Sequence, residues 1–224
     1  MPVQNLIVID SKKSCHQEIK VENMVKTKFV TRLALMAVLA LACTAFAQET
    51  KIVESGETTV ALSSGFVNAL QNLGVTPGVI SPTQLNGTTV NFPINGGALD
   101  LKTALGNIGH SGGLTLSAGG TVVSIENFTI DTTGKSPVIT GLVVANGTLV
   151  GRITLFDIAL PGNFKLPLTQ YRAVLIDLQG VTVTLDGAAA NALNQAFNTN
   201  AFKAGFGIGT ARVRAFTNGW VPKS

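Results

Sequence analysis

The chain has very few of the side chains that most often carry enzyme chemistry. Both cysteines, Cys15 and Cys43, and all three methionines precede residue 48, so residues 48–224 contain no thiol. That part of the chain has one histidine, His110. A cysteine nucleophile and disulfides are therefore excluded there, and a Ser-His-Asp triad could use only His110. We also expect no metal site, because one histidine cannot supply the several ligands that zinc takes.

Carboxylates are present but scattered. They do not form the Asp-x-Asx-x-Asx-Gly loop that places several oxygens around calcium. A carboxylate pair assembled by the fold, as in glycosidases, stays open, and Asp100, Glu126 and Asp131 are its first candidates. Because no catalytic constellation is recognisable, we expect that the protein is not an enzyme.

Charge of one sign is scarce as well. Residues 48–224 carry ten Lys and Arg against nine Asp and Glu, a net charge of +1, whereas the whole chain carries +4. Nucleic-acid binding requires clustered positive charge that neutralises phosphates. We therefore expect no nucleic-acid partner.

Residues 24–47 have the three parts of a cleavable signal peptide in the required order. A basic stretch precedes an apolar run at residues 33–42, and Ala-Phe-Ala follows at 45–47. The run is about ten residues long, which is too short to cross a bilayer. A buried core helix is the alternative interpretation of this run, and lipidation of Cys43 is a second alternative.

Residues 1–23 do not resemble the start of a signal peptide. They are predicted to be a leader extension or sequence upstream of a true start at Met24. The exported product is then a single β-rich domain, residues 48–224. It is predicted to be secreted or held in the cell envelope, in the periplasm or at the cell surface, with no membrane span after cleavage.

Alternation of apolar and polar residues predicts antiparallel strands through most of this domain. In residues 121–131 the parity changes between Ile125 and Phe128, which indicates a bulge near Asn127. Asn146-Gly147 favours a type I′ hairpin between strands at 138–145 and 148–158. Further strands are predicted at 58–62, 88–94, 114–117, 174–178, 181–185 and 210–216. So many short strands predict a mainly β fold, an antiparallel sandwich or barrel.

Two segments interrupt the strands in the same way and predict an internal two-fold repeat with two short helices. Val60–Ser63 matches Val183–Asp186 without a gap, and each ends on a residue that can cap a helix. Asn-Ala-Leu then recurs at 68–70 and 191–193. Chance recurrence in an alanine-rich chain is the alternative.

The most distinctive local segment is the glycine-rich run around His110. Gly109 precedes the histidine, and Ser111, Gly112 and Gly113 follow it. One interpretation is a tight turn in which the imidazole hydrogen-bonds a nearby carbonyl group. The functional interpretation makes residues 110–113 an exposed ligand-binding loop, with Tyr171 as a partner of His110.

Several stretches resemble a family of small secreted bacterial β-rich proteins that have no assigned activity. They are Phe92–Ile94, His110–Leu114 and Asn127–Asp131, and the resemblance extends over most of residues 48–224.

The His-Ser-Gly-Gly-Leu run at 110–114 is also similar to the histidine-glycine stretch of Hta-type domains, which bind haem at the bacterial surface. In that family a tyrosine that follows a Ser-Phe-Arg motif ligates haem. The corresponding run here is Phe66–Ala69, with Ala69 at the position of the tyrosine. The resemblance therefore leaves His110 and Tyr171 as haem ligands.

The sequence thus favours a non-catalytic binding or structural module, with no cofactor, that meets an unknown extracellular or envelope partner. The alternative is a protein that binds haem or a small apolar ligand through the His110 loop, in a pocket between the β layers.

Overall fold

The computed structural model describes residues 50–171 and 175–218. The predicted leader segments, 1–23 and 24–47, lie outside these described residues. The strands are β1 (Thr50–Leu62), β2 (Thr76–Ile80), β3 (Gln84–Asn86), β4 (Thr89–Asp100), β5 (Gly106–His110), β6 (Gly113–Ala118), β7 (Thr121–Asp131), β8 (Val138–Ala145), β9 (Thr148–Ala159), β10 (Leu175–Leu185) and β11 (Gly207–Thr217). The helices are α2 (Ser64–Asn72) and α3 (Gly187–Ala196).

Eight of the described strands close into an antiparallel barrel. Around the ring they follow the order β1, β4, β5, β7, β8, β9, β10 and β11, and β11 pairs with β1. Strands β2 and β6 extend the sheet beyond β7, and β3 pairs with β4. The prediction of an antiparallel sandwich or barrel is confirmed, and of the two the fold is a barrel.

Local turn chemistry was sufficient to predict two features of the barrel wall. Asn146 and Gly147 have φ angles of 49° and 80°, the left-handed geometry of the predicted hairpin between β8 and β9. In β7, Asn127 has a φ of 50°, and the pairing with β8 shifts register between Glu126 and Thr129. This is the predicted bulge.

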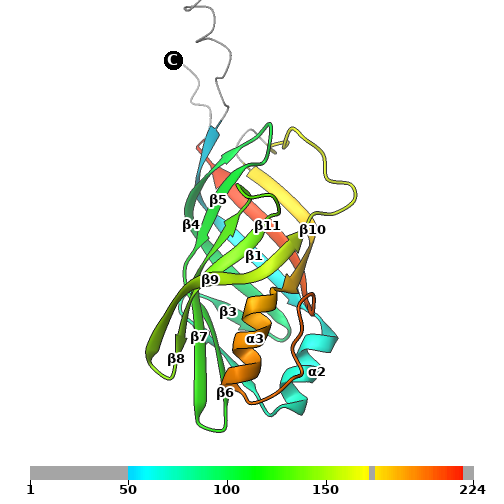
Figure 1. Cartoon of the computed structure of the whole chain (residues 1–224). Helices are drawn as coiled ribbons and strands as arrows, with labels where there is room; N and C mark the ends of the chain where they lie inside the picture. The colour runs from blue at the N-terminus through cyan, green and yellow to red at the C-terminus, as the bar shows by residue number, and fades with distance from the viewer. Residues whose placement is uncertain (1–49, 172–174, 219–224) are drawn as a thin grey trace, which may run out of the picture. The chain divides into compact units, whose positions relative to one another are not determined.

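The strand-cap-helix unit predicted twice from sequence occurs twice. The Ser63 hydroxyl accepts a hydrogen bond from the Phe66 N–H at 3.0 Å, and the Asp186 carboxylate accepts one from the Ala188 N–H at 2.8 Å. Each cap satisfies free N–H groups in the first helical turn. Helices α2 and α3 both lie at one end of the barrel, as Figure 1 shows. The start of β1 and the end of β11 lie at the opposite end.

Two groups of buried side chains fill the barrel. The first group lies at the helical end and includes Phe66 and Leu70 of α2, Ala189 of α3, and Phe92 and Phe128 of the wall. The second group fills the opposite end: Val53, Ile94, Leu99, Leu101, Ile108, Ile130, Ile176, Val213 and Ala215. The interior of the barrel is therefore divided between a helical end and an opposite end.

Three strands were not predicted, and two predicted strands are one. Strands β2, β3 and β5 carry Pro or Gly or are very short, so they show little alternation. The strands expected at 174–178 and 181–185 form a single strand, β10, with a register shift between Leu178 and Val181. A bulge interrupts the sequence pattern there without ending the strand.

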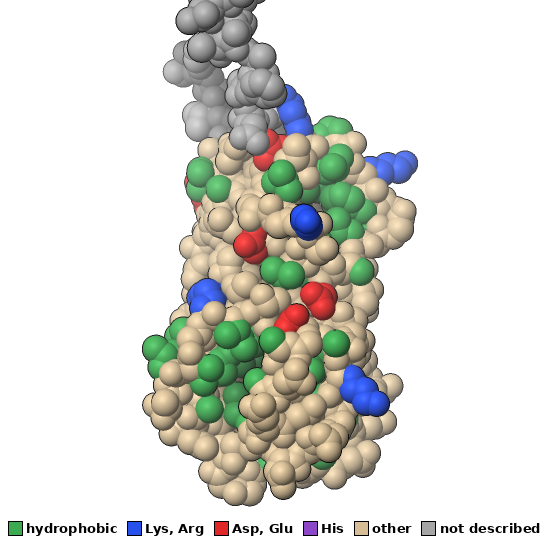
Figure 2. Space-filling view, viewed as in Figure 1, with side chains coloured by type: hydrophobic (Ala, Val, Ile, Leu, Met, Phe, Trp, Pro, Cys, Tyr) green, Lys and Arg blue, Asp and Glu red, His purple; other side chains and the backbone are tan. Residues whose placement is uncertain are grey.

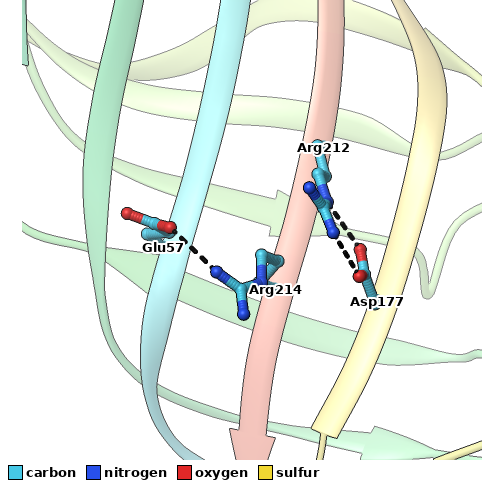
Figure 3. A network of polar contacts seen from close by, with 4 residues as sticks. All are labelled: Glu57, Asp177, Arg212 and Arg214. Carbon is cyan, nitrogen blue, oxygen red and sulfur yellow. Dashed lines mark hydrogen bonds and ion pairs between the residues drawn. The ribbon is translucent and has the colours of Figure 1, made fainter. Parts of the chain in front are cut away.

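Ion pairs cross three neighbouring strands, β1, β11 and β10 (Figure 3). Arg212 Nε donates to the Asp177 carboxylate at 2.8 Å, and Arg214 lies 3.5 Å from Glu57. The hydrogen bond from Arg212 lowers the pKa of Asp177. All four side chains are partly exposed to solvent, so each pair contributes little to stability.

We expect Asp177→Asn to lower the free energy of unfolding by about 0.5 kcal/mol, because a solvent-exposed pair is screened and its side chains lose entropy. The loss should shrink in high salt. Urea denaturation at low and high ionic strength would measure it. A loss above about 2 kcal/mol would contradict the view that this network is a minor contributor.

Among the described residues, no helix is both long and apolar enough to cross a membrane.

Candidate functional site

The helical end of the barrel contains a cavity of about 430 Å³. Its walls come from α2, α3 and strands β4, β6, β7, β8 and β9, among other segments. Phe66 and Leu70 line it from one helix, and Ala189, Ala192 and Ala196 line it from the other. Ligand pockets in proteins usually measure about 300–1,000 Å³, so this cavity could hold a small molecule.

The cavity opens to solvent beside α3. Val150, at the start of β9, lines the cavity and is 59% exposed, and Ala192 and Gln195 of α3 are exposed lining residues as well. Figure 2 shows hydrophobic side chains gathered over β7, β8 and β9 next to α3. Gln195 carries the one polar side chain among the described residues that line the cavity. The opening is therefore uncharged and largely apolar.

A smaller pocket of about 50 Å³ adjoins the cavity on the side towards the middle of the barrel. Residues from several strands line both spaces: Leu62, Val90, Leu114, Phe156 and Ile208. His110 and Thr58 line only the smaller pocket. The histidine thus lies in the smaller pocket, at the inner end of two adjoining apolar spaces.

His110 is buried and forms two hydrogen bonds within the barrel. Its Nδ1 lies 3.3 Å from the carbonyl oxygen of Phe128, and its Nε2 lies 2.7 Å from Thr58 Oγ1. A carbonyl oxygen only accepts, so Nδ1 must carry the proton in the neutral ring. Nε2 then accepts the hydrogen bond that the Thr58 hydroxyl donates. Both ring nitrogens are engaged.

Burial lowers the pKa of His110 to about 4, and the hydrogen bond to the Phe128 carbonyl opposes this shift only in part. The imidazole is therefore neutral at pH 7. The functional expectation placed His110 in an exposed loop, and this is wrong: the side chain is 3% exposed and ends a strand, β5. Its position between Ile94 and the β7 strand directs it into the barrel.

The residues that follow His110 shape the wall. At Ser111 and Gly112 the chain leaves the barrel between β5 and β6, and the Ser111 N–H donates to the Pro93 carbonyl at 3.0 Å. Gly112 has a φ of 81°, and a Cβ there would lie 2.6 Å from the Ile80 carbonyl oxygen. A Cβ on Gly113 would collide with the backbone of Ile125. Both glycines permit close backbone approach.

Tyr171 does not lie with His110. It is 63% exposed, forms an isolated β-bridge with Leu175, and lines neither the cavity nor the smaller pocket. The expected partnership of these two side chains is therefore not found. Leu114, which ends the His-Ser-Gly-Gly-Leu run, does line both spaces.

The three carboxylates singled out for catalysis make local hydrogen bonds and line neither space. Asp100 accepts from the N–H groups of Lys102 and Thr103, and these bonds lower its pKa. Asp131 accepts from Thr133, and Glu126 accepts from the Ser124 hydroxyl. Within the described part of the chain, no group of three or more His, Cys, Asp or Glu could hold a metal ion.

The sequence-based alternative placed a ligand pocket between the β layers, and it missed the cavity at the helical end and the three alanines of helix α3 that line it. Ala189, Ala192 and Ala196 recur at spacings of three and four, the period of one helix face. Small side chains on that face leave space where larger ones would pack against the wall. The spacing was visible in the sequence, but its meaning depends on what the helix faces.

No family model and no curated protein matches the chain. Among solved structures, the C-terminal domain of HtaA from Corynebacterium glutamicum is 19% identical, with a TM-score of 0.56, and the match covers 75% of this chain and 99% of that one. The N-terminal domain of HtaA is 17% identical, with a TM-score of 0.56 and coverage of 74% and 98%. A structure described as heme binding protein HtaB from the same organism is 12% identical, with a TM-score of 0.50 and coverage of 75% and 96%.

These matches span nearly the whole of each HtaA domain, and at these sequence identities they show a shared fold alone. The similarity to Hta-type domains suggested by residues 110–114 is thereby confirmed at the level of structure. The described residues form a barrel with the fold of the Hta-type domains.

Proposed function

We propose that this protein is an exported carrier that binds a small apolar molecule in the cavity between the helices and the barrel. The observation that carries the proposal is a cavity of about 430 Å³ whose lining is apolar except for Gln195. Protein interiors are normally packed to high density, and an unfilled apolar space of this size forfeits dispersion contacts. A ligand that filled it would recover those contacts.

Export is part of this proposal and rests on the sequence of residues 24–47. A carrier outside the cytoplasm would bring an insoluble molecule to or from the cell envelope. The proposal gives a ligand class to the non-catalytic binding or structural module that the sequence favoured, and it prefers binding because a purely structural role would not need a cavity. In the proposed site His110 closes the inner end, and Ser111, Gly112 and Gly113 hold the adjoining wall.

Nile red, an uncharged dye that fluoresces in apolar surroundings, tests the proposal directly. We expect saturable binding of one dye per chain and a rise in the thermal midpoint, because a ligand that binds only the folded state stabilises it. Fluorescence titration and thermal denaturation with and without dye would measure both. A linear, non-saturating signal with no thermal shift would overturn the proposal.

Haem is the second candidate ligand, and one observation favours it: a neighbour with the same fold is described as a heme binding protein. The residues of this chain do not fit haem well. The described lining of the larger cavity includes no His, Tyr, Cys or Met, the usual axial ligands of haem iron. His110 could coordinate iron only by releasing Thr58 or Phe128, since both of its nitrogens are engaged.

A haemin titration separates the two candidates. If haem is the ligand, the wild-type protein should show a Soret band shift with one haem per chain, and His110→Ala should abolish the shift. Tyr171→Phe is the matched control, because that side chain lies outside the cavity lining. If the wild type shows no spectral change, or if His110→Ala binds equally well, haem ligation through His110 is wrong.

A further inference from the structure

The charge and polarity around the cavity narrow the class of ligand, if the proposed carrier function holds. The described side chains that line the larger cavity include no Lys, Arg, Asp or Glu, and those of the smaller pocket include none either. Burying an ionised group without a partner costs several kcal/mol. A carboxylate is therefore disfavoured throughout this space.

The inner end has no group that would bind a charged or strongly polar part of a ligand. His110 is neutral, and the Thr58 hydroxyl already donates to its Nε2. The remaining lining of the smaller pocket is apolar. The hydrocarbon body of a ligand should thus point inward.

The mouth is where a polar end can be accommodated. Gln195 is exposed there and lines the cavity from α3, and its amide can both donate and accept hydrogen bonds. Exposed Val150 lines the same cavity, and its neighbour Leu149 is 63% exposed. An uncharged hydroxyl or carbonyl group would match this edge, whereas a carboxylate there would find no cation among the lining residues.

We propose that the cavity selects an uncharged lipid, with its hydrocarbon body in the barrel and a single hydroxyl or carbonyl group beside Gln195, and disfavours both haem and the carboxylate of the same hydrocarbon body. The ligand class is thus a neutral long-chain or polycyclic alcohol or ester. Selection rests on the polar end, because an ionised group at this opening loses part of its hydration and finds no cation among the lining residues. The apolar contacts are nearly the same for an alcohol, an ester and an acid of one chain length.

Three molecules with one hydrocarbon tail test this selection: dodecanol, methyl dodecanoate and dodecanoate. Each competes with Nile red for the full chain at about pH 8, where the acid is ionised. We expect the alcohol and the ester to bind about tenfold more tightly than the acid. Equal affinities, or tighter binding of the acid, would overturn the inference.

The Gln195→Lys variant tests whether a cation at the mouth improves binding of the acid. A cation at the mouth should raise the affinity for dodecanoate about fivefold and leave that for methyl dodecanoate unchanged. Gln71→Lys is the matched control, because Gln71 is an exposed α2 residue that does not line the cavity. If both variants improve acid binding equally, net charge and not the mouth is responsible, and the proposed place of the polar end is wrong.

The outcomes separate this inference from the carrier proposal on which it rests. If neither Nile red nor any dodecyl compound binds, the carrier function itself fails. If all of them bind but the acid is not disfavoured, the carrier stands and the selection for neutral lipids fails. A haemin complex tighter than the dodecanol complex, with a Soret shift, would also overturn the selection.

Discussion

Replacement of Ala196 by phenylalanine is expected to weaken the binding of Nile red and of dodecanol by at least about tenfold, or about 1.4 kcal/mol. Ala196 lies in the last turn of α3, is half-buried, and lines the cavity. An aromatic ring at this position would occupy the space that the ligand needs. Titration of the variant with each compound would measure the loss.

The same substitution should leave the fold intact or stabilise it. Large side chains added to a packed core cause strain, but a ring that enters an empty space gains contacts, and cavity-filling changes commonly add about 0.5–2 kcal/mol. A raised thermal midpoint together with lost binding would show that the cavity is the site. Lost binding with a lowered midpoint would instead indicate that the ring disrupts the packing of α3 against the barrel.

Ala188→Phe supplies the matched control. Ala188 is an exposed residue of the same helix, and it does not line the cavity. The variant should bind both compounds with wild-type affinity. If Ala188→Phe and Ala196→Phe bind equally well, the ligand occupies another place and the proposed function loses its site.

The features that sequence reasoning recovered are those that local chemistry determines. The Asn146-Gly147 turn requires left-handed backbone that Asn and Gly adopt readily, so the hairpin follows from two residues. The caps at Ser63 and Asp186 follow from the need of free N–H groups for an acceptor. Each of these depends on contacts within a few residues along the chain.

The environment of His110 could not be predicted in this way. Strand β5 reads Gly-Asn-Ile-Gly-His, in which the glycines leave no apolar alternation to identify a strand or its inward face. The partner of Nε2, Thr58, is 52 residues distant in the chain. The alternation in β1 places Thr58 on the same inward face as Val60, but it does not identify His110 as the partner of Thr58. Only the closed barrel shows that the imidazole is buried.

The cavity is a still less local property. It depends on the size of side chains that α3 sets opposite the barrel wall, and the pairing of β7 with β8 must close the ring before any such space exists. The sequence showed a strand, a cap and an alanine-rich helix, and each was confirmed. How far the helix stands from the wall is set by the packing of the whole first group of buried residues.

The protein is expected to lose about 3 kcal/mol of stability between pH 7 and pH 4 because of His110. The pKa of the buried imidazole is about 4, whereas in the unfolded chain it is about 6.5. Above pH 6.5 the ring is neutral in both states and makes no contribution to the pH dependence. As the pH falls below 6.5, only the unfolded chain takes up the proton, so unfolding becomes more favourable until the folded ring titrates near pH 4.

His110→Gln isolates this effect, because glutamine has no charge at any pH and is close to histidine in reach. The variant is expected to be less stable than the wild type at pH 7, since a buried hydrogen-bond pair is altered. Its free energy of unfolding should nevertheless stay nearly constant from pH 6.5 to pH 4.5. Urea denaturation of both proteins at intervals across this range would give the two slopes.

The carboxylates affect stability at a lower pH than His110 does, so they cannot produce the same pH dependence. The pKa values of Asp100, Asp131 and Asp177 are lowered by hydrogen bonds, so their stabilisation is present above the ordinary carboxyl pKa of 3.8 and is lost as the pH falls below it. Both proteins should share that loss. If the two slopes between pH 6.5 and pH 4.5 coincide, His110 is accessible to protons in the folded state, and the inner end of the cavity is open to water. In that case the pocket would not be neutral and apolar, and the proposed selection for uncharged lipids would be wrong as well.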